Sequence, residues 1–455
     1  MFQNRIWHVA GLLLVLAALT SCAAGKSATA RQARLVKQEI QSSKVFANAH
    51  TGFILMDAQT GEPLVTVNDN QLFTPASCTK ILTLATSLEY LGDSLPSLEV
   101  ARTNDQRWIV RGKGDPTFLH PNYQAWQSAF QWMKEQQDPL IIERRMVPRY
   151  GQGWAWDDYN DTYAAERSDF PYYGNVIQWQ KTGDGQWVST PKHPGTPVYE
   201  PGNDLYPKTI GVFRLEQLPY FLLSHPDSIF GVGFTDKIPI PEMAVDGGMI
   251  TFYLPDTLGK PFDHVCYQNF PGSCEAEVDG PWRTLYSTPR DTVLRQMMYV
   301  SDNFLAEQLL LMCADRKFGA LKEEMIIQEM LNTSFAAIVP MPRWVDGSGL
   351  SRYNLISPGG LAYVLKRLWD KQPREKLLSY FPYPGGSGPF KDWPASLPLY
   401  AKTGGMSGVA CLSGFLRAKS GKMLIFSLMH NNFTGPAKPY RAESQRILQF
   451  IYERF

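Results

Sequence analysis

Four residues near the start of the chain pair a hydroxyl with a nearby lysine in a way that could generate a nucleophile. Ser77-Cys78-Thr79-Lys80 opens an expected helix, and residues three apart lie on the same face of a helix. A hydroxyl attacks a carbonyl once a base removes its proton, and burial beside another cation lowers the pKa of a lysine enough for that task. Ser189-Thr190-Pro191-Lys192 has the same spacing, but Pro191 forbids an ordinary helix interior there. A solvated helix start is the alternative interpretation of Ser77 and Lys80.

Two further tripeptides could complete such a site. Ser301-Asp302-Asn303 interrupts an apolar helical pattern and is expected in a loop between two helices, with simple helix capping as the alternative. Lys-Thr-Gly occurs twice. Lys181-Thr182-Gly183 lies between two strand-like runs, where the neighbouring Gly and Asp favour a hairpin turn. Lys402-Thr403-Gly404 ends an apolar strand, where a lysine and exposed backbone N–H groups could hold a carboxylate or a developing oxyanion.

The elements that must position these residues come from both ends of the chain. GFILMDAQTGEPLVTVN predicts a β-hairpin, and the apolar spacing after Lys80 predicts a helix that ends at Gly92. Helical periodicity returns after residue 288, and three strand-like segments and a final helix near 440–453 follow. The core is therefore expected to be split, with residues 46–94 and 286–455 forming one domain.

The region between these two parts has a different composition. From residue 95 to residue 285, aromatic residues, Gly and Pro are frequent and helical periodicity is rare. RWIVRG and MITFYL are the clearest expected strands in it. We interpret residues 95–285 as one or two inserted β-rich domains.

The N-terminus predicts export. An apolar run of signal-peptide length follows Arg5, and it is too short for a membrane span, which needs about 20 residues. Leu19-Thr20-Ser21-Cys22 looks like a bacterial lipobox, so residues 1–21 are expected to be a lipoprotein signal peptide, Cys22 the lipidated residue and residues 22–45 a tether. A plain signal peptide with a chance cysteine is the alternative. Because Ala23 follows the cysteine, a periplasmic protein anchored to the outer membrane is one expected destination.

Composition and cysteine spacing exclude several classes of protein. The formal net charge of +1 gives no general attraction to nucleic acid, and no cysteine or histidine spacing indicates a metal site. Cys266 and Cys274 are close enough in sequence to close a small disulfide loop in an oxidising compartment. The remaining cysteines, Cys78, Cys313 and Cys411, are expected to be buried thiols.

The order of the motifs points to one family. S-x-x-K on a helix, S-D-N between helices and K-T-G on a strand is the signature of serine penicillin-recognising enzymes, and only the Lys402 copy satisfies the order. The sequence resembles the class C low-molecular-mass penicillin-binding proteins, the D-alanyl-D-alanine carboxypeptidase/endopeptidases. The segments that carry the resemblance are RGKGDPTF, GWAWDDYNDTYAA, VDGSGLSRYNLISP and AKTGGMSGVACLSGF.

The resemblance implies a fold and an activity. The fold is an α/β (α+β) core like that of penicillin-binding proteins and serine β-lactamases, with an antiparallel sheet flanked by helices and with inserted β-rich domains. The activity is hydrolysis of peptidoglycan stem peptides through an acyl-enzyme on Ser77, with β-lactams as covalent inhibitors and with no cofactor or metal. A serine β-lactamase and a non-catalytic peptidoglycan-binding or sensor lipoprotein remain as alternatives.

The resemblance also assigns the catalytic roles. Ser77 becomes the acylated nucleophile and Lys80 its general base. Ser301 and Lys402 would relay the proton to the leaving amine.

Substrate-binding roles are assigned in the same way. Asn303 would hydrogen-bond the substrate amide, backbone N–H groups of Ser77 and Gly405 would form the oxyanion hole, and Thr403, beside Gly404, would help to hold the terminal carboxylate. A pocket for the side chain of the stem peptide, suited to a free ammonium group, is expected from four residues: Asp158, Arg352, Met406 and Ser407. Asp157 competes with Asp158 for this role.

Gly405 departs from the pattern of the family, which commonly has Thr or Ser at this position. The backbone donor survives, but a hydroxyl for the substrate carboxylate is lost. The sequence therefore predicts weaker discrimination for a free C-terminal D-Ala and a larger endopeptidase share.

Overall fold

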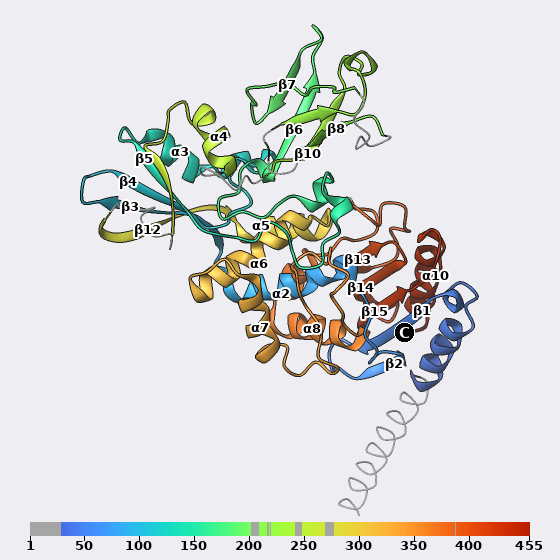
Figure 1. Ribbon diagram of the computed structural model, residues 1–455. Helices are drawn as coiled ribbons and strands as arrows, with labels where there is room; N and C mark the ends of the chain where they lie inside the picture. The colour runs from blue at the N-terminus through green and yellow to red at the C-terminus, as the bar shows by residue number, and fades with distance from the viewer. Residues whose placement is uncertain are drawn as a thin grey trace, which may run out of the picture. The chain divides into compact units, whose positions relative to one another are not determined.

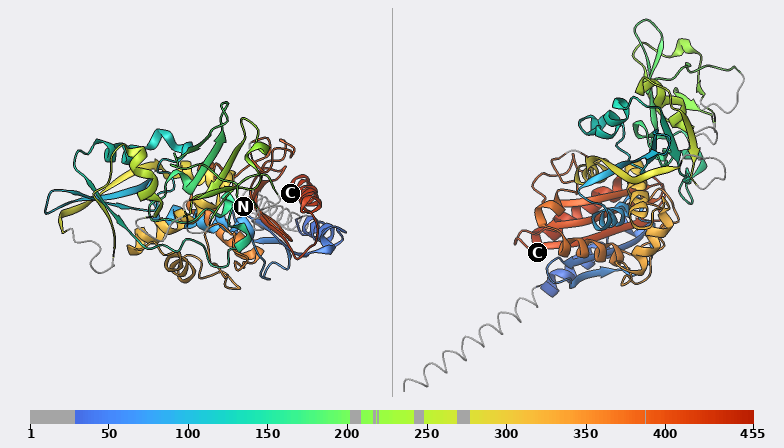
Figure 2. Two further views of the ribbon diagram at one scale, coloured as in Figure 1. Left: turned by 45° about the horizontal axis from the view of Figure 1, so that its top comes forward. Right: turned by 90° about the vertical axis from the view of Figure 1, so that its left-hand side faces the viewer.

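The structure, a computed structural model, describes residues 29–201, 209–215, 218, 220–241, 248–268, 277–386 and 388–455. The chain divides into two compact units, and each is described separately (Figures 1 and 2). The first unit comprises Met1–Cys78, Ile338–Pro342 and Leu355–Phe455, and the second comprises Thr79–Ala337 and Arg343–Asn354. The predicted signal peptide, Cys22 and the start of the tether lie outside the described residues. The predicted domain boundaries at residues 95 and 285 stay a prediction.

The first unit is built on a five-stranded antiparallel sheet with the strand order β13-β14-β15-β1-β2. The predicted hairpin is present, because β1 pairs with β2 across a short turn. The strands are β1 (His50–Asp57), β2 (Pro63–Val67), β13 (Leu399–Met406), β14 (Val409–Arg417) and β15 (Met423–Asn431). Strands from both ends of the chain therefore share one sheet, as the split core predicted.

Helices cover both faces of this sheet (Figure 1). Apolar side chains of α10 (Lys438–Arg454) and of a helix over residues 29–41 join one buried cluster with alternate residues of the strands. On the opposite face, α8 (Pro358–Lys371) packs against β15 and β1, and its Trp369 ring contacts Phe415 of β14. The remaining short helices of this unit are η1 (Phe46–Asn48) and α9 (Arg374–Leu378).

The second unit contains a group of packed helices. α6 (Asn303–Phe318) is buried along most of its length and packs against three other helices of this unit. They are α2 (Lys80–Tyr90), α5 (Arg290–Tyr299) and α7 (Glu323–Asn332). The buried residues of α6 include Glu307 and Gln308 as well as apolar side chains, so neighbours surround the helix on most sides.

The rest of the second unit is rich in β-structure. A mixed sheet has the order β11-β5-β4-β3-β12, a smaller one has the order β10-β6-β7, and β8 pairs with β9. The strands are β3 (Ser94–Thr103), β4 (Trp108–Gly112), β5 (Leu140–Arg144), β6 (Val176–Lys181), β7 (Trp187–Thr190), β8 (Val212–Arg214), β9 (Phe221–Leu223), β10 (Thr235–Pro239), β11 (His264–Tyr267) and β12 (Val278–Pro289). The helices are α3 (Ser128–Glu135), α4 (Gly248–Leu258), η3 (Pro121–Trp126), η4 (Trp156–Asp158), η5 (Thr162–Ala164), η6 (Tyr173–Asn175) and η7 (Asp227–Ile229); η2 (Ala76–Thr79) leads into α2.

One expected strand is wrong. MITFYL lies in helix α4, although RWIVRG forms β4 as predicted. The helical pattern is visible in the buried side chains of α4, because Ile250, Tyr253, Leu254 and Leu258 recur at a spacing of three or four residues. The six residues of MITFYL are too few to show this helical spacing in the sequence, and their aromatic and β-branched side chains favoured a strand.

The cysteines follow the predictions where the structure describes them. Cys78, Cys313 and Cys411 are buried free thiols. Cys266 is disulfide-bonded, and its predicted partner, Cys274, lies outside the described residues. Among the described residues, no helix is both long enough and apolar enough to cross a membrane.

Candidate active site

Ser77 lies beside the strand that carries Lys402. In the first unit, the Cys78 thiol donates a hydrogen bond to the backbone oxygen of Lys402 at 3.3 Å. A side chain at Gly404 would overlap the backbone oxygen of Pro75 and would lie 3.0 Å from the backbone nitrogen of Cys78. Glycine therefore allows β13 to approach the segment that holds Ser77, so the first and third motifs meet.

Lys402 itself is buried. Its side chain is 1% exposed, and Nζ donates to the backbone oxygen of Thr403 at 2.8 Å. Burial lowers the pKa of Lys402 to about 8, because the low-dielectric surroundings disfavour the ammonium form. Near neutral pH this lysine therefore gives up and accepts a proton far more readily than an exposed one.

Lys80 and Asn303 meet in the second unit. Lys80 is fully buried, and its Nζ donates to Oδ1 of Asn303 at 2.6 Å and to the backbone oxygen of Ser348 at 2.8 Å. The packing of α2 against α6 brings the first turns of both helices together. Lysine and asparagine, more than 200 positions apart in sequence, are thus joined directly.

Two interpretations of the second motif, a loop between helices and a helix cap, are both partly confirmed. Asp302 caps α6 by accepting a hydrogen bond from the backbone N–H of Leu305 at 2.9 Å. Ser301 lies between α5 and α6 with a left-handed φ of 61°, which is uncommon for a residue with a side chain. Ser301 and Asn303 line a cavity of about 380 Å³ within the second unit, together with His120 and Tyr163. Capping therefore explains Asp302, and all three residues of the motif border the cavity.

Asp158 is linked to Asn303 through one tyrosine. Asn303 Nδ2 donates to the backbone oxygen of Tyr163 at 2.9 Å. The Tyr163 hydroxyl donates to Asp158 at 2.7 Å and to Asp161 at 2.9 Å. Tyr163 and Asp161 were not singled out from the sequence, and the only signal for them was their place in the GWAWDDYNDTYAA segment.

The other residues predicted for the side-chain pocket are divided between the units. Arg352 is an exposed residue of the second unit. Met406 and Ser407 belong to the first unit, at the end of β13. A pocket shared by these residues and Asp158 stays a prediction.

A buried acidic network holds the loop behind Lys80. The Ser348 N–H donates to Glu307 at 2.8 Å, while the Ser348 carbonyl accepts from Lys80. Asp346 accepts from the N–H groups of Gly349 and Ser351 at 2.8 and 2.7 Å. Burial raises the pKa of Glu307 to about 7, because desolvation disfavours the carboxylate. These contacts fix the carbonyl that orients Lys80, which explains the D-G-S-G-L-S stretch structurally.

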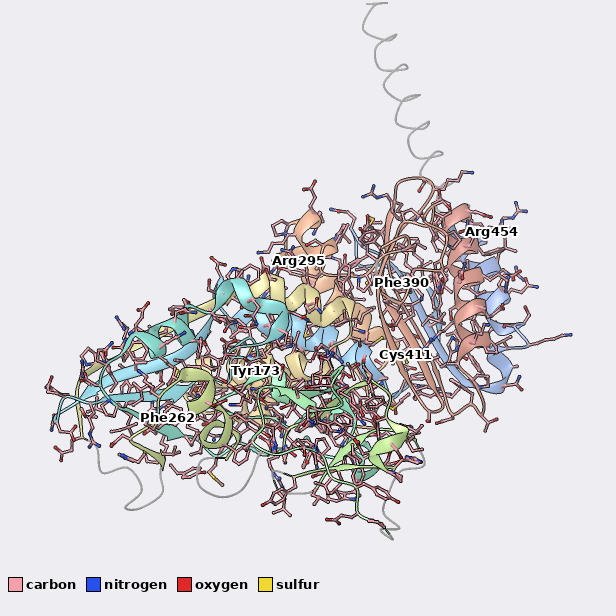
Figure 3. The ribbon with its side chains drawn as sticks, turned by 90° about the horizontal axis from the view of Figure 1, so that it is seen from above. Tyr173, Phe262, Arg295, Phe390, Cys411 and Arg454 are labelled. Carbon is pink, nitrogen blue, oxygen red and sulfur yellow. The ribbon has the colours of Figure 1, made fainter. Side chains whose placement is uncertain are left out.

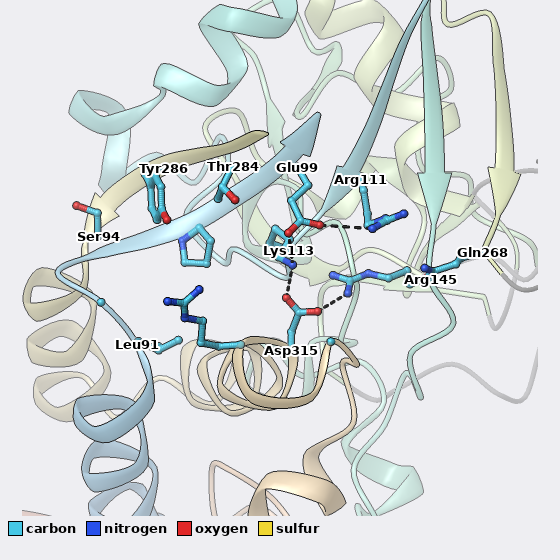
Figure 4. Close-up of a pocket in the computed structure, with 14 residues that line it drawn as sticks. Leu91, Ser94, Glu99, Arg111, Lys113, Arg145, Gln268, Thr284, Tyr286 and Asp315 are labelled. Atoms are coloured by element: carbon cyan, nitrogen blue, oxygen red, sulfur yellow. Dashed lines mark hydrogen bonds and ion pairs between the residues drawn. The ribbon is translucent and has the colours of Figure 1, made fainter. Parts of the chain in front are cut away.

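A second cavity in the same unit has a different character. It measures about 360 Å³ and is lined by charged side chains that pair with one another (Figure 4). Lys113 contacts Glu99 at 2.9 Å and Asp315 at 2.5 Å, and Arg145 also pairs with Asp315. Asp315 lies near the opposite end of α6 from Asn303, roughly 18 Å along the helix axis at 1.5 Å per residue. Arg111 and Arg316 also line this cavity, so it carries more positive than negative side chains, and it shares no residue with the predicted site.

Within the ranges that the structure describes, no group of three or more His, Cys, Asp or Glu side chains is placed to hold a metal ion.

Comparison with known proteins identifies the family. The model of the D-Ala-D-Ala carboxypeptidase 3 (S13) family matches residues 33–198 and 279–450. The chain belongs to this family. It is therefore a serine D-Ala-D-Ala carboxypeptidase, and the family and enzyme class predicted from the three motifs are confirmed.

Individual relatives cover most of the chain at low identity. D-alanyl-D-alanine carboxypeptidase DacB of Haemophilus influenzae is 20% identical over 473 residues, covering 90% of this chain and 91% of the relative. The D-alanyl-D-alanine carboxypeptidase of Actinomadura is 25% identical, covering 86% of this chain and 79% of the relative. The crystal structure of penicillin-binding protein 4 from Haemophilus influenzae matches with a TM-score of 0.70 and 18% identity, covering 92% and 99% of the two chains. The predicted fold class is thereby confirmed.

Proposed function

We propose that the chain hydrolyses the terminal D-Ala-D-Ala bond of peptidoglycan stem peptides through an acyl-enzyme on Ser77. The observation that carries the assignment is the pair of contacts around the first motif. Lys80 donates to Asn303, and the neighbour of Ser77, Cys78, donates to Lys402. Both contacts support a site in which the three motifs cooperate.

The geometry of Lys80 suits a general base. Asn303 Oδ1 and the Ser348 carbonyl accept hydrogen bonds from Nζ and so hold the lysine nitrogen at the start of α2. The S-x-x-K spacing predicts that Lys80 lies one helical turn from Ser77, with the proton acceptor on the same face as the hydroxyl.

The reaction then follows in two steps. Ser77 Oγ attacks the carbonyl carbon of the penultimate D-Ala as its proton passes to Lys80. The C–N bond breaks, the amine of the last D-Ala takes a proton through Ser301 and Lys402, and an ester remains on Ser77. Water attacks this ester, releases the shortened peptide as a carboxylate and restores the serine. Lys402, with a pKa of about 8, suits proton relay near neutral pH.

Cross-linked peptides present the same bond with a different amine. When the leaving group is the amine of a neighbouring stem peptide, the same steps give endopeptidase activity. The carboxylates of Asp158 and Asp161, linked through Tyr163 to Asn303, suit a free ammonium on the stem peptide.

The experiment that tests the nucleophile is the intact mass of the protein after incubation with benzylpenicillin. We expect a persistent adduct of one penicillin that maps to Ser77 and is absent from Ser77→Ala. Ser189→Ala is the matched control, because Ser189 has the same S-x-x-K spacing but lies at the end of strand β7. An adduct that disappears with hydrolysis of the penicillin would indicate a β-lactamase. No adduct, with penicillin recovered intact, would contradict the assignment of Ser77.

We also propose that the protein is exported and anchored to a membrane through lipid on Cys22. Support comes from the lipobox-like sequence after a short apolar run. Labelling cells with radioactive palmitate should give a labelled protein, and Cys22→Ala should remove the label. A label that survives this substitution would contradict the anchor.

A further inference from the structure

The two faces of β13 carry different groups. Side chains alternate along a strand, so Lys402 and Gly404 face the segment that holds Ser77, whereas Thr403 and Gly405 face the other way. On that second face, a Cβ at Gly405 would lie 3.3 Å from a terminal nitrogen of Arg441. The guanidinium of Arg441 therefore reaches the place of the Thr or Ser side chain that the family resemblance leads us to expect at position 405.

Arg441 and Thr403 border the same cavity. This cavity measures about 120 Å³ and lies within the first unit, between β13, the start of α10 and the segment around residue 390. Phe390 and Cys411 also line it (Figure 3). A hydroxyl and a guanidinium thus border one space next to the strand edge that is assigned to the substrate.

The charge of Arg441 is available to a ligand. Arg441 is exposed, and in the described part of the chain no carboxylate lies within ion-pair distance of it. The nearest acid on the helix in sequence, Glu443, is engaged by Arg446 at 2.9 Å and by the hydroxyl of Ser43 at 2.8 Å. Arg446 in turn reaches Glu39 at 2.8 Å. Arg446 is therefore held by acids of the protein, whereas Arg441 reaches toward Gly405 and, among the described residues, has no such partner.

We propose that Arg441 binds the terminal carboxylate of the substrate's last D-Ala, in the role of the hydroxyl that is missing at position 405. A guanidinium binds a carboxylate through two parallel N–H bonds, and charge-assisted hydrogen bonds are stronger than those of a neutral hydroxyl. Gly405 then has a second function, because a side chain there would crowd the guanidinium. The proposal rests on the proposed function, and it reverses the expectation that Gly405 weakens selection for a free carboxylate.

The test compares two acylated dipeptide substrates, one ending in D-Ala-D-Ala as the free acid and one as its C-terminal amide. We expect Arg441→Ala to lower kcat/KM for the free acid on the order of 10- to 100-fold, the worth of one charge-assisted hydrogen bond. The value for the amide should change less than about 3-fold, since the amide has no charge to lose. Arg441→Gln should behave as Arg441→Ala does, and Arg441→Lys should retain part of the preference. Lys438→Ala is the matched control, because it removes an exposed cation from the same helix.

A double variant sharpens the test. Gly405→Thr in the Arg441→Ala protein should restore part of the preference for the free acid, because the space left by the guanidinium accommodates the new hydroxyl. Equal losses for acid and amide in both Arg441→Ala and Arg441→Gln would show a structural role and overturn the proposal, as would an unchanged acid-to-amide ratio. Failure of the proposed function is separate, since it would appear as a parent protein that forms no penicillin adduct on Ser77.

Discussion

The chain contains the same tripeptide, Lys-Thr-Gly, in two regions with opposite surroundings. Lys181 ends β6 at a hairpin, is 7% exposed, and donates to Asp227 at 2.9 Å. Lys402 lies in β13 at the edge of the central sheet of the first unit, is 1% exposed, and donates to the backbone oxygen of Thr403. Lys181 is paired with a carboxylate, whereas burial disfavours the charge of Lys402.

The glycines of the two copies differ as much as the lysines. A Cβ at Gly183 would meet nothing within 4 Å, whereas one at Gly404 would overlap the backbone that leads to Ser77. Three identical residues therefore lie at a turn in one region and pack against the segment that holds Ser77 in the other. The environment of the tripeptide, and not its residue types alone, therefore decides its chemistry.

Removing each lysine in turn should give the largest difference between the two tripeptides. Lys402→Met should lower the rate of penicillin acylation by about 10³-fold, within the usual range for a proton-transfer group. Lys181→Met should leave that rate within about 2-fold, because Lys181 serves only a partly exposed ion pair. Stopped-flow or quenched mass measurements of the adduct give both rates. Equal losses in the two variants would show that the tripeptides are not functionally distinct.

The pH dependence of stability should separate the same two variants. The pKa of Lys402 is about 8 in the folded protein and 10.5 for an ordinary lysine, so the unfolded chain binds more protons between these values. The free energy of unfolding should therefore gain a favourable contribution as pH rises from 8 to 10.5, on the order of 3 kcal/mol for a shift of this size.

Urea unfolding of the parent and both variants across this pH range measures the contribution. Lys402→Met should lose it, and Lys181→Met should keep it. Identical pH profiles for the parent and Lys402→Met would contradict the lowered pKa.

Replacing the glycine of each tripeptide by alanine should give the smallest difference between the two tripeptides. Gly404→Ala should cost about 1–3 kcal/mol of stability and slow acylation, because β13 or the segment around Pro75 must move. Gly183→Ala should change stability by less than about 0.5 kcal/mol, since its surroundings are open. Thermal unfolding and acylation rates measure both effects. A tolerated Gly404→Ala would show that the strand and the Ser77 segment are not closely packed.

Much of this arrangement could be predicted from the sequence because its signals are local. Alternation predicted the hairpin of β1 and β2, and the broken helical pattern placed Ser301 between α5 and α6. Pro191 distinguished the Ser189–Lys192 stretch from the first motif, and the Gly-Asp turn after Lys181 distinguished the first Lys-Thr-Gly from the second. Each of these signals depends on a few neighbouring residues.

The parts that could not be predicted depend on contacts between distant residues. The bond from Ser348 to Glu307 and the approach of Arg441 to Gly405 have no local signature. Helix α4 shows a second limit, because Ile250 and Tyr253 suit a strand as well as a buried helix.

The buried thiols can serve as natural chemical probes of unfolding. Cys78 and Cys411 lie in the first unit and Cys313 lies in the second, and none of the three is in a disulfide. Burial raises the pKa of Cys411, and that of Cys313 to about 12, so in the folded state these two side chains hold almost no reactive thiolate. Pulse labelling with an alkylating reagent would therefore time the opening of each unit separately, without any engineered probe.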